Sequence, residues 1–342
     1  MVMRKLFHLY LFLLVVAVGV CFCEALDCKP KFFGFTKLRI VNNWEGNSSN
    51  FFNFQVNKLR MGIEGQVVDK LSYLALVEGG FVAPNSFTFS PLDIYVNYKF
   101  SPAIELRFGQ DWYKFGWEYT QPIPTLPFIN FSDFAATVFD GMGRTGNYGY
   151  DVGVWFNGIL KLKNINLGYN GGILNGSGLN TIDNNNKKDI FIRTYLEPVE
   201  FFHLGISIFQ GYSRIKTEDL KDDLFAIEVM IKFKNLTNIN EFYYSENQES
   251  KKQTNLYPKI IKRGYYVFLG YGISPYQIIC RYERNSNLFL SNEIGNVYTF
   301  GVNYQIKGLN KIGIDYVTRD YSMKHNISNS IIIQCQILFN NL

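Results

Sequence analysis

The stretch 298–319, YTFGVNYQIKGLNKIGIDYVTR, decides the fold because apolar residues alternate in it with polar or small ones. Its first half is apolar at even positions, and after a turn at Lys307–Asn310 the second half repeats the pattern. A period of two is typical of β-strands whose two faces meet different surroundings. In the first half, Tyr298, Phe300, Val302 and Tyr304 alternate with Thr299, Gly301, Asn303 and Gln305. The stretch therefore predicts a β-hairpin with one apolar and one polar face.

The same alternation recurs along most of the chain from Phe33 onward. Leu92, Ile94, Val96 and Tyr98, for example, are predicted to share an apolar face. In residues 52–65 the alternation changes phase between Val56 and Lys58, which predicts a bulge there. Strands are expected to begin near residues 33, 52, 69, 91, 103, 148, 163, 188, 200, 223, 238, 264, 276, 296, 310 and 329.

The connections between these strands are of two kinds, which alternate along the chain. Every second connection is a tight turn, as at Phe100–Pro102 and Lys307–Asn310. The others are long and polar, at 43–51, 80–90, 112–147, 174–187, 213–222, 246–262, 285–295 and 320–328. Tight turns at one end and long loops at the other are typical of an outer-membrane barrel, whereas Greek-key sandwiches do not sort their loops in this way. We predict an all-β, transmembrane antiparallel β-barrel of about 16 strands.

Residues 1–25 have the pattern of a signal peptide. Arg4 and Lys5 precede an apolar core, and Cys23 to Ala25 resemble a cleavage site. A retained anchor helix and a lipoprotein at Cys21 are the alternatives. Residues 26–342 are then a single barrel domain with three scattered cysteines, Cys28, Cys280 and Cys335, which form neither a disulfide framework nor a metal site. The net charge of +5 is too small to indicate nucleic-acid binding.

The segment Trp112–Tyr148 is the longest interruption of the strand pattern. It is rich in aromatic residues and contains Pro122, Pro124 and Pro127, with no helical period. A structureless segment of this length inside a compact domain is usually functional or disordered, and disorder disfavours so many aromatic residues. We therefore expect residues 112–147 to fold inward as a constriction loop that narrows the bore of the barrel.

Several stretches of strand and turn resemble a known family. The runs NFQVNKLRMGIEGQVVDKLSYLALVEGG and SPLDIYVNYKFSPAIELRFGQDWYKFGWE are similar to the opening of phosphate-selective porins of the O and P family. The stretches 175–198 and 263–284 and the run YTFGVNYQIKG extend the resemblance over nearly the whole mature chain. It implies a 16-strand channel, trimeric, with the third long loop in the pore. The loop offers only Lys114 and Arg144 as cations, however, so phosphate selectivity does not follow from it.

The polar face of the strands is expected to line the pore, where charged side chains set ion preference. Arg107 is the first candidate for a basic track that carries anions, because it leads into the long segment. The alternative is that these charges are cross-strand ion pairs that hold the wall together. The candidate pore-lining and selectivity residues are Arg107, Arg60, Arg193, Arg281, Lys114, Arg144, Glu118 and Asp111.

The aromatic residues of the loop, foremost Trp112, Trp117 and Tyr119, have two interpretations. They either form a stacking surface for sugars or other solutes with an apolar face, or pack the loop against the wall. The run Gly141–Gly146 matches a dinucleotide-binding motif, but a strand follows it where that site needs a helix. We therefore expect no cofactor, no metal and no enzymatic activity.

Taken together, these patterns predict an outer-membrane porin of a Gram-negative-type bacterium, exported through a cleaved signal peptide. It would pass small hydrophilic solutes and ions by diffusion, with mixed or mildly anion-favouring selectivity. The alternatives are a phosphate-selective or anion-selective channel, a surface structural or adhesive barrel with an incidental pore, and a secreted soluble β protein. Membrane lipid, lipopolysaccharide and small anions are the expected partners, and the family resemblance adds a homotrimer.

Overall fold

The fold is a closed antiparallel β-barrel of sixteen strands, seen in a computed structural model. It describes residues 30–46, 50–83, 86–133, 135–136, 149–215, 218–248, 259–287, 293–321 and 327–339. The first eight strands are β1 (Lys31–Glu45), β2 (Phe51–Val68), β3 (Leu71–Ala83), β4 (Ser86–Ser101), β5 (Ile104–Trp112), β6 (Tyr150–Leu162), β7 (Ile165–Leu174) and β8 (Asp189–Val199). The others are β9 (Phe202–Ile215), β10 (Glu218–Phe233), β11 (Leu236–Gln248), β12 (Lys259–Ile273), β13 (Tyr276–Asn287), β14 (Glu293–Lys307), β15 (Asn310–Tyr321) and β16 (Ile327–Phe339).

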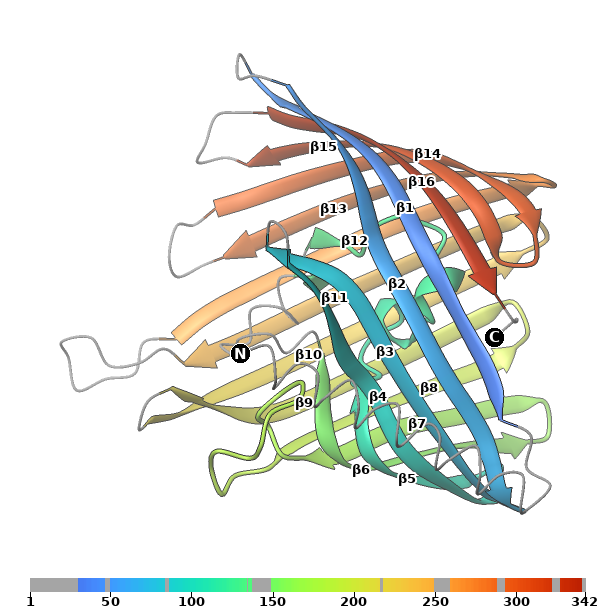
Figure 1. The fold of residues 1–342 in the computed structure, drawn as a ribbon, viewed down its shortest axis with the longest axis vertical. Coiled ribbons are helices and arrows are strands. Elements are labelled where there is room, and N and C mark those ends of the chain that lie inside the picture. Colours follow the sequence, from blue (N-terminus) through green and yellow to red (C-terminus); the bar gives the residue numbers. More distant parts are fainter. Residues whose placement is uncertain are drawn as a thin grey trace.

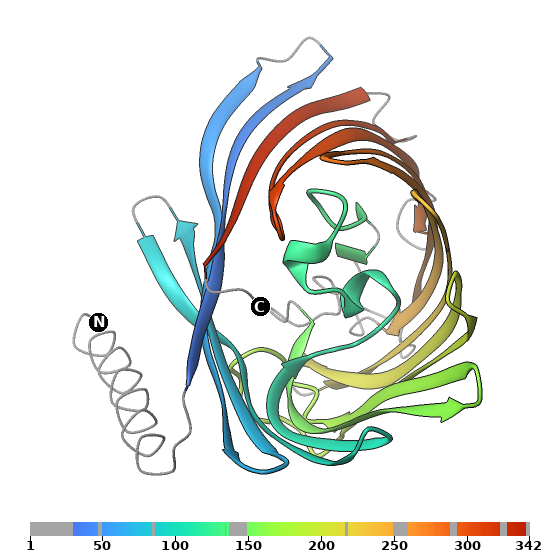
Figure 2. The same cartoon turned by 90° about the vertical axis from the view of Figure 1, so that its right-hand side faces the viewer.

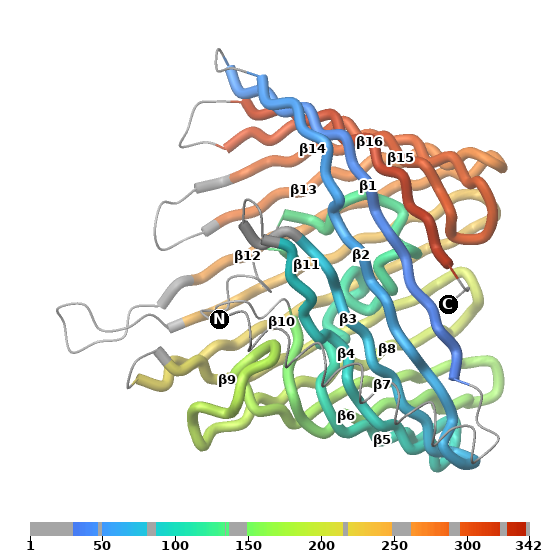
Figure 3. Tube along the Cα trace, viewed as in Figure 1, coloured from blue at the N-terminus to red at the C-terminus, as the bar shows by residue number. Residues whose placement is uncertain are grey.

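Each strand pairs with its sequence neighbours, and β1 pairs with β16 to close the barrel, as predicted. The strands run obliquely around the bore (Figures 1 and 3). Closure leaves no exposed sheet edge. The predicted bulge is also confirmed: Lys58 pairs with Lys37 and Val56 with Leu38, so that Asn57 is the extra residue.

The two faces of the sheet are inverted relative to those of a soluble protein. Apolar side chains of the alternating phase point outward: Phe54 is 70% exposed and Phe300 is 58% exposed. Polar and charged side chains of the opposite phase are buried inside, among them Glu228 and Asn303. A lipid environment favours this arrangement. No helix among the described residues is long and apolar enough to cross a membrane.

Two details of the sequence prediction are wrong. Leu92 faces the interior and is buried, because the β3–β4 register shifts between Ala75 and Val77 and changes the phase of β4 at that point. The second wrong detail is the prediction of long loops at 80–90 and 213–222, because most of these residues belong to strands. Polar residues there continue the ladder, because backbone pairing does not require an apolar face.

The tight turns have two residues each and lie between β2 and β3, β4 and β5, β6 and β7, β8 and β9, β10 and β11, β12 and β13, and β14 and β15. The turns expected at Asn157–Lys161 and Glu197–Val199 lie later, at residues 163–164 and 200–201, because β6 and β8 continue through the expected positions. The barrel therefore has a turn end and a loop end. The predicted signal peptide and Cys28 lie outside the described residues, whereas Cys280 and Cys335 are free thiols on β13 and β16.

Candidate functional site

The segment that follows β5 crosses the interior of the barrel. Figure 2 shows it inside the ring of strands, with two short 3-10 turns, η1 (Glu118–Thr120) and η2 (Ile123–Thr125). Its aromatic side chains pack against one another and against the wall. Trp112 lies 6.0 Å from Tyr150 between ring centroids, and Tyr119 lies 4.7 Å from Phe131. Trp112, Trp117 and Tyr119 are all buried. Most of the surface of these side chains is therefore in contact with other parts of the loop or with the wall.

Wall carboxylates and hydroxyls accept hydrogen bonds from the start of the segment. The backbone N–H of Trp117 donates to Glu241 Oε1 at 2.7 Å, and the N–H of Gly116 donates to Ser207 Oγ at 3.0 Å. Gly116 has φ +66°, and a Cβ there would lie 1.9 Å from Glu241 Oε1. A side chain at this position would therefore strain the backbone and separate the loop from its acceptor.

Wall donors hold the carbonyl groups of the next part of the segment. Pro122, Pro124 and Pro127 have no N–H, so this stretch presents mainly acceptors. The donor-to-acceptor pairs are Lys37 to Ile123, Gln336 to Pro124, Lys311 to Leu126, Asn303 to Pro127, Arg39 to Ile129, and Arg281 to Asn130. Charged groups on β1, β13 and β15 thus anchor the loop through its backbone.

Carboxylates fix the far part of the segment. Asp133 forms an ion pair with Arg319 at 2.7 Å, and its N–H donates to Glu283 Oε2 at 2.7 Å. Burial raises the pKa of the Asp133 carboxyl, but the hydrogen bonds and charge of Arg319 more than offset it, so its pKa is below its usual value. The pKa of Glu118 is raised, because its complete burial outweighs the nearby charge of Arg281.

Of the five predicted pore arginines, four lie in the described part of the chain, and three of these four have buried carboxylate partners. Arg107 is paired with Asp111, and its guanidinium lies 3.8 Å from the ring centroid of Tyr95. Arg193 is paired with Glu228 and lies 3.3 Å from His203 Nε2. The pair of Arg193 and Glu228 joins β8 and β10, as in the cross-strand alternative that the sequence left open, whereas Arg107 and Asp111 lie on one strand, β5.

Arg281 is the third. It contacts Glu118 at 3.3 Å and Glu283 at 2.8 Å. Lys114 lies 3.9 Å from Asp111 and 5.1 Å from the ring centroid of Trp112, and burial lowers its pKa. Arg144 lies outside the described residues.

The fourth described arginine, Arg60, belongs to a group of cations on one side of the barrel. Arg60 and Lys58 share a single carboxylate, Glu78, at 2.6 and 3.1 Å. The strand register places Lys311, Gln336, Lys37 and Lys58 in one row across β15, β16, β1 and β2. Sequence reasoning missed Lys37 and Arg39. The signal was the Lys-x-Arg spacing at 37–39, which repeats at 58–60 on the neighbouring strand and puts both cations of each pair on one face.

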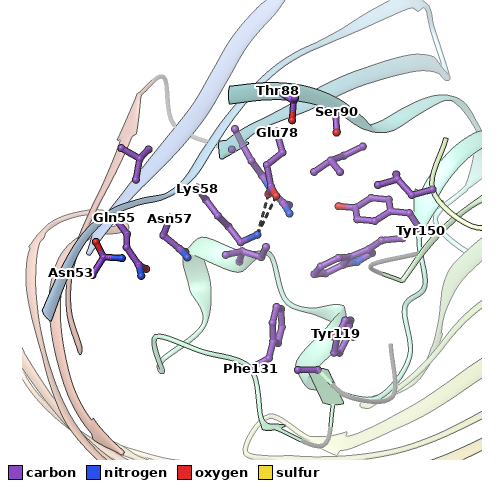
Figure 4. Close-up of a pocket in the computed structure, with 18 of the residues that line it drawn as sticks. Asn53, Gln55, Asn57, Lys58, Glu78, Thr88, Ser90, Tyr119, Phe131 and Tyr150 are labelled. Atoms are coloured by element: carbon purple, nitrogen blue, oxygen red, sulfur yellow. Dashed lines mark hydrogen bonds and ion pairs between the residues drawn. The ribbon is translucent and has the colours of Figure 1, made fainter. Parts of the chain in front are cut away.

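A cavity of about 880 Å³ separates this cationic wall from the loop. Its lining includes Lys58, Arg60 and Glu78 on the wall and Tyr119 and Phe131 on the loop (Figure 4). A second cavity, of about 900 Å³, lies against the same wall toward the turn end and includes Arg107 in its lining. A third, of about 570 Å³, lies beneath the loop beside Arg193 and His203.

No cluster of three His, Cys, Asp or Glu side chains that could hold a metal ion occurs within the described part of the chain. The glycine-rich run 141–146 lies outside the described residues, so the cofactor prediction stays a prediction.

The comparisons with known proteins agree with the barrel. Residues 33–186 match the family model described as phosphate-selective porin O and P, which confirms the resemblance over that part. No curated protein matches the chain.

Among solved structures, the anion-selective porin from Comamonas acidovorans has a TM-score of 0.67 at 10% identity, covering 91% of this chain and 100% of that one. The outer-membrane channel DcaP of Acinetobacter baumannii has 0.68 at 12%, covering 91% and 97%. OmpT of Vibrio cholerae, in a trimer form, has 0.61 at 13%, covering 91% and 99%.

Proposed function

We propose, from the premise that this chain is a passive outer-membrane channel of the porin type, that solutes cross the barrel along the wall of β2–β5. The support is the position of the two large cavities. One includes Arg60 and Leu92 in its lining on the loop side, and the other includes Leu74 and Tyr95 on the turn side of the same strands. The loop fills the opposite side of the bore, where its backbone is hydrogen-bonded to Ser207 and Glu241.

This passage favours small anions mildly over cations. Lys37, Lys58 and Arg60 line or adjoin its loop-side half, with Glu78 as the carboxylate that pairs with Lys58 and Arg60. Charges along a pore wall set ion preference, and two or three cations against one carboxylate leave a modest positive potential. The constriction loop itself carries few cations, so strong phosphate selectivity is not part of the proposal.

The proposal includes export through a cleaved signal peptide and assembly as a homotrimer in contact with membrane lipid and lipopolysaccharide. The support for a trimer is the trimer form of OmpT, which shares the fold. Sequencing the N-terminus of the mature protein and measuring the mass of the detergent-solubilised oligomer test these two statements.

Single-channel recording of the purified full chain in a planar bilayer tests the function. Under a KCl gradient we expect discrete conductance steps with a reversal potential that mildly favours chloride. Phosphate at millimolar concentration is expected to leave the current largely unblocked. Strong block by phosphate would replace the general channel with a phosphate-selective one, and an absence of steps would contradict a conducting pore.

A further inference from the structure

The loop-side cavity has one wall of neutral polar side chains that have no hydrogen-bond partner among the described residues. Asn53 and Gln55 on β2 and Thr88 and Ser90 on β4 line it, as Figure 4 shows. Within the described residues, none of these four side chains makes a hydrogen bond. Together they offer amide and hydroxyl groups that both donate and accept.

The facing wall is aromatic and comes mainly from the loop. Tyr119, Phe131 and Tyr150 line the cavity away from the polar strands (Figure 4), and Trp112 is also part of its lining. Buried polar atoms normally have a hydrogen-bond partner, yet Trp112 Nε1 has none in the described structure although Trp112 is only 6% exposed. The same holds for Asn57 Oδ1, on the polar wall. These two atoms are buried, so the groups that a ligand in the cavity could reach are those of Asn53, Gln55, Thr88 and Ser90, beside an apolar surface.

The ionic group at the inner end of the cavity adds fixed, directional groups. Glu78 is held by Arg60 at 2.6 Å and by Lys58 at 3.1 Å. Because each charge has a partner, the cluster supplies carboxylate acceptors and N–H donors at defined positions rather than a strong net field. A multiply charged anion would meet the Glu78 carboxylate and the amide oxygens of the polar wall, which oppose it.

We infer that this cavity is a binding subsite for sugars, specifically mono- or disaccharides that enter from the loop end. A sugar ring has hydroxyl groups around its edge, each both donor and acceptor, and C–H groups on its faces. The edge matches the polar wall and the ionic cluster, and a face matches the aromatic wall. The volume of about 880 Å³ lies in the range of small-molecule sites. This inference rests on the proposed channel function, whose solute class it specifies.

The test is current block by sucrose, added at the loop side of the full-length channel in a planar bilayer with KCl. Tetraethylene glycol, which lacks a ring of hydroxyls, is the control solute. We expect saturable block by sucrose at millimolar concentration and none by the glycol. The variants Gln55→Leu and Thr88→Val should weaken block several-fold. Thr237→Val, on β11 beside the separate cavity beneath the loop, should leave it unchanged.

The outcomes separate this inference from the channel itself. Conduction with equal, non-saturating effects of sucrose and the glycol overturns the sugar subsite and leaves the channel intact. If no conduction is seen, calorimetric titration of sucrose into the full chain in detergent decides the inference independently. Binding that Gln55→Leu weakens supports it, and no heat of binding overturns it.

Discussion

The wall of β8–β13 and the wall of β2–β4 carry the same alternation of inward charges, yet the charges have different neighbours. On β8–β13, Arg193 and Arg281 are buried and paired with carboxylates, and Arg281 also contacts the loop. On β2, Lys58 and Arg60 share one carboxylate and line an open cavity. The same residue types therefore anchor the loop where they contact it and line a cavity where they do not.

The strongest test of this difference is removal of a covered arginine. Arg281→Ala leaves Glu118 and Glu283 buried without their main cationic partner. Breaking a buried ion pair costs about 3–5 kcal/mol, so we expect the urea midpoint of the folded barrel in lipid vesicles to fall markedly. Lys232→Ala, at an exposed position on β10, is the control and should change stability by less than about 0.5 kcal/mol. If the two variants are equally stable, Arg281 has no structural role.

A second test weakens the loop without touching a charge. Gly116→Ala places a methyl group on a residue with φ +66° and against Glu241 Oε1. The left-handed conformation alone costs about 1–2 kcal/mol, and the overlap adds to it, so we expect lower stability and a larger conductance as the loop moves from the wall.

The matched control is Gly308→Ala. Gly308 also has positive φ, +58°, but a Cβ there meets nothing within 4 Å. It isolates the backbone strain. If conductance rises equally in both variants, the contact between Gly116 and Glu241 does not control the width of the pore.

A third test compares two cations on the two kinds of surface. Lys58→Glu should move the permeability ratio toward cations, because Lys58 lines the loop-side cavity. A unit charge at 4 Å in water is worth about 1 kcal/mol, so the change of two units corresponds to a change in the ratio of up to about 30-fold.

Arg107→Glu should have a smaller effect on selectivity and a larger one on stability, because it sets a carboxylate beside buried Asp111. Reversal potentials in a KCl gradient measure the first and urea midpoints the second. The reverse order of selectivity effects would restore Arg107 as the main selectivity residue.

The smallest expected effect is the pH dependence that Asp133 contributes. The pKa of the Asp133 carboxyl is lower in the folded state than in the unfolded chain. The ionised carboxylate therefore stabilises the barrel at pH values above the unfolded pKa. This stabilisation is lost as the pH falls through the folded pKa. Asp133→Asn should therefore cost on the order of 1 kcal/mol at neutral pH and close to nothing in strong acid. Thermal unfolding of both proteins across this range measures it. A difference that persists in acid would assign the cost to lost hydrogen bonds rather than charge.

Most of the wall could be predicted from the sequence. Tyr298, Phe300 and Val302 face outward because alternation on a strand is a local property of the chain. The bulge at Asn57 was visible as a break in that alternation. Leu92 was assigned to the wrong face because the register shift between β3 and β4 arises from the pairing of two strands and leaves no mark on either alone.

The sequence by itself determined the sixteen strands, their two faces and their order around the barrel, since each depends on neighbours along the chain or on short turns. Tertiary structure decided which charged side chains bind the loop and which face a cavity. Whether Arg281 anchors the loop or meets solutes depends on where the backbone of residues 112–133 lies, and this in turn depends on partners such as Glu241 and Lys311, more than a hundred residues away. Electrostatic partners at such separations carry no periodic signal, so only the folded barrel distinguishes Arg281, which anchors the loop, from Arg60, which lines a cavity.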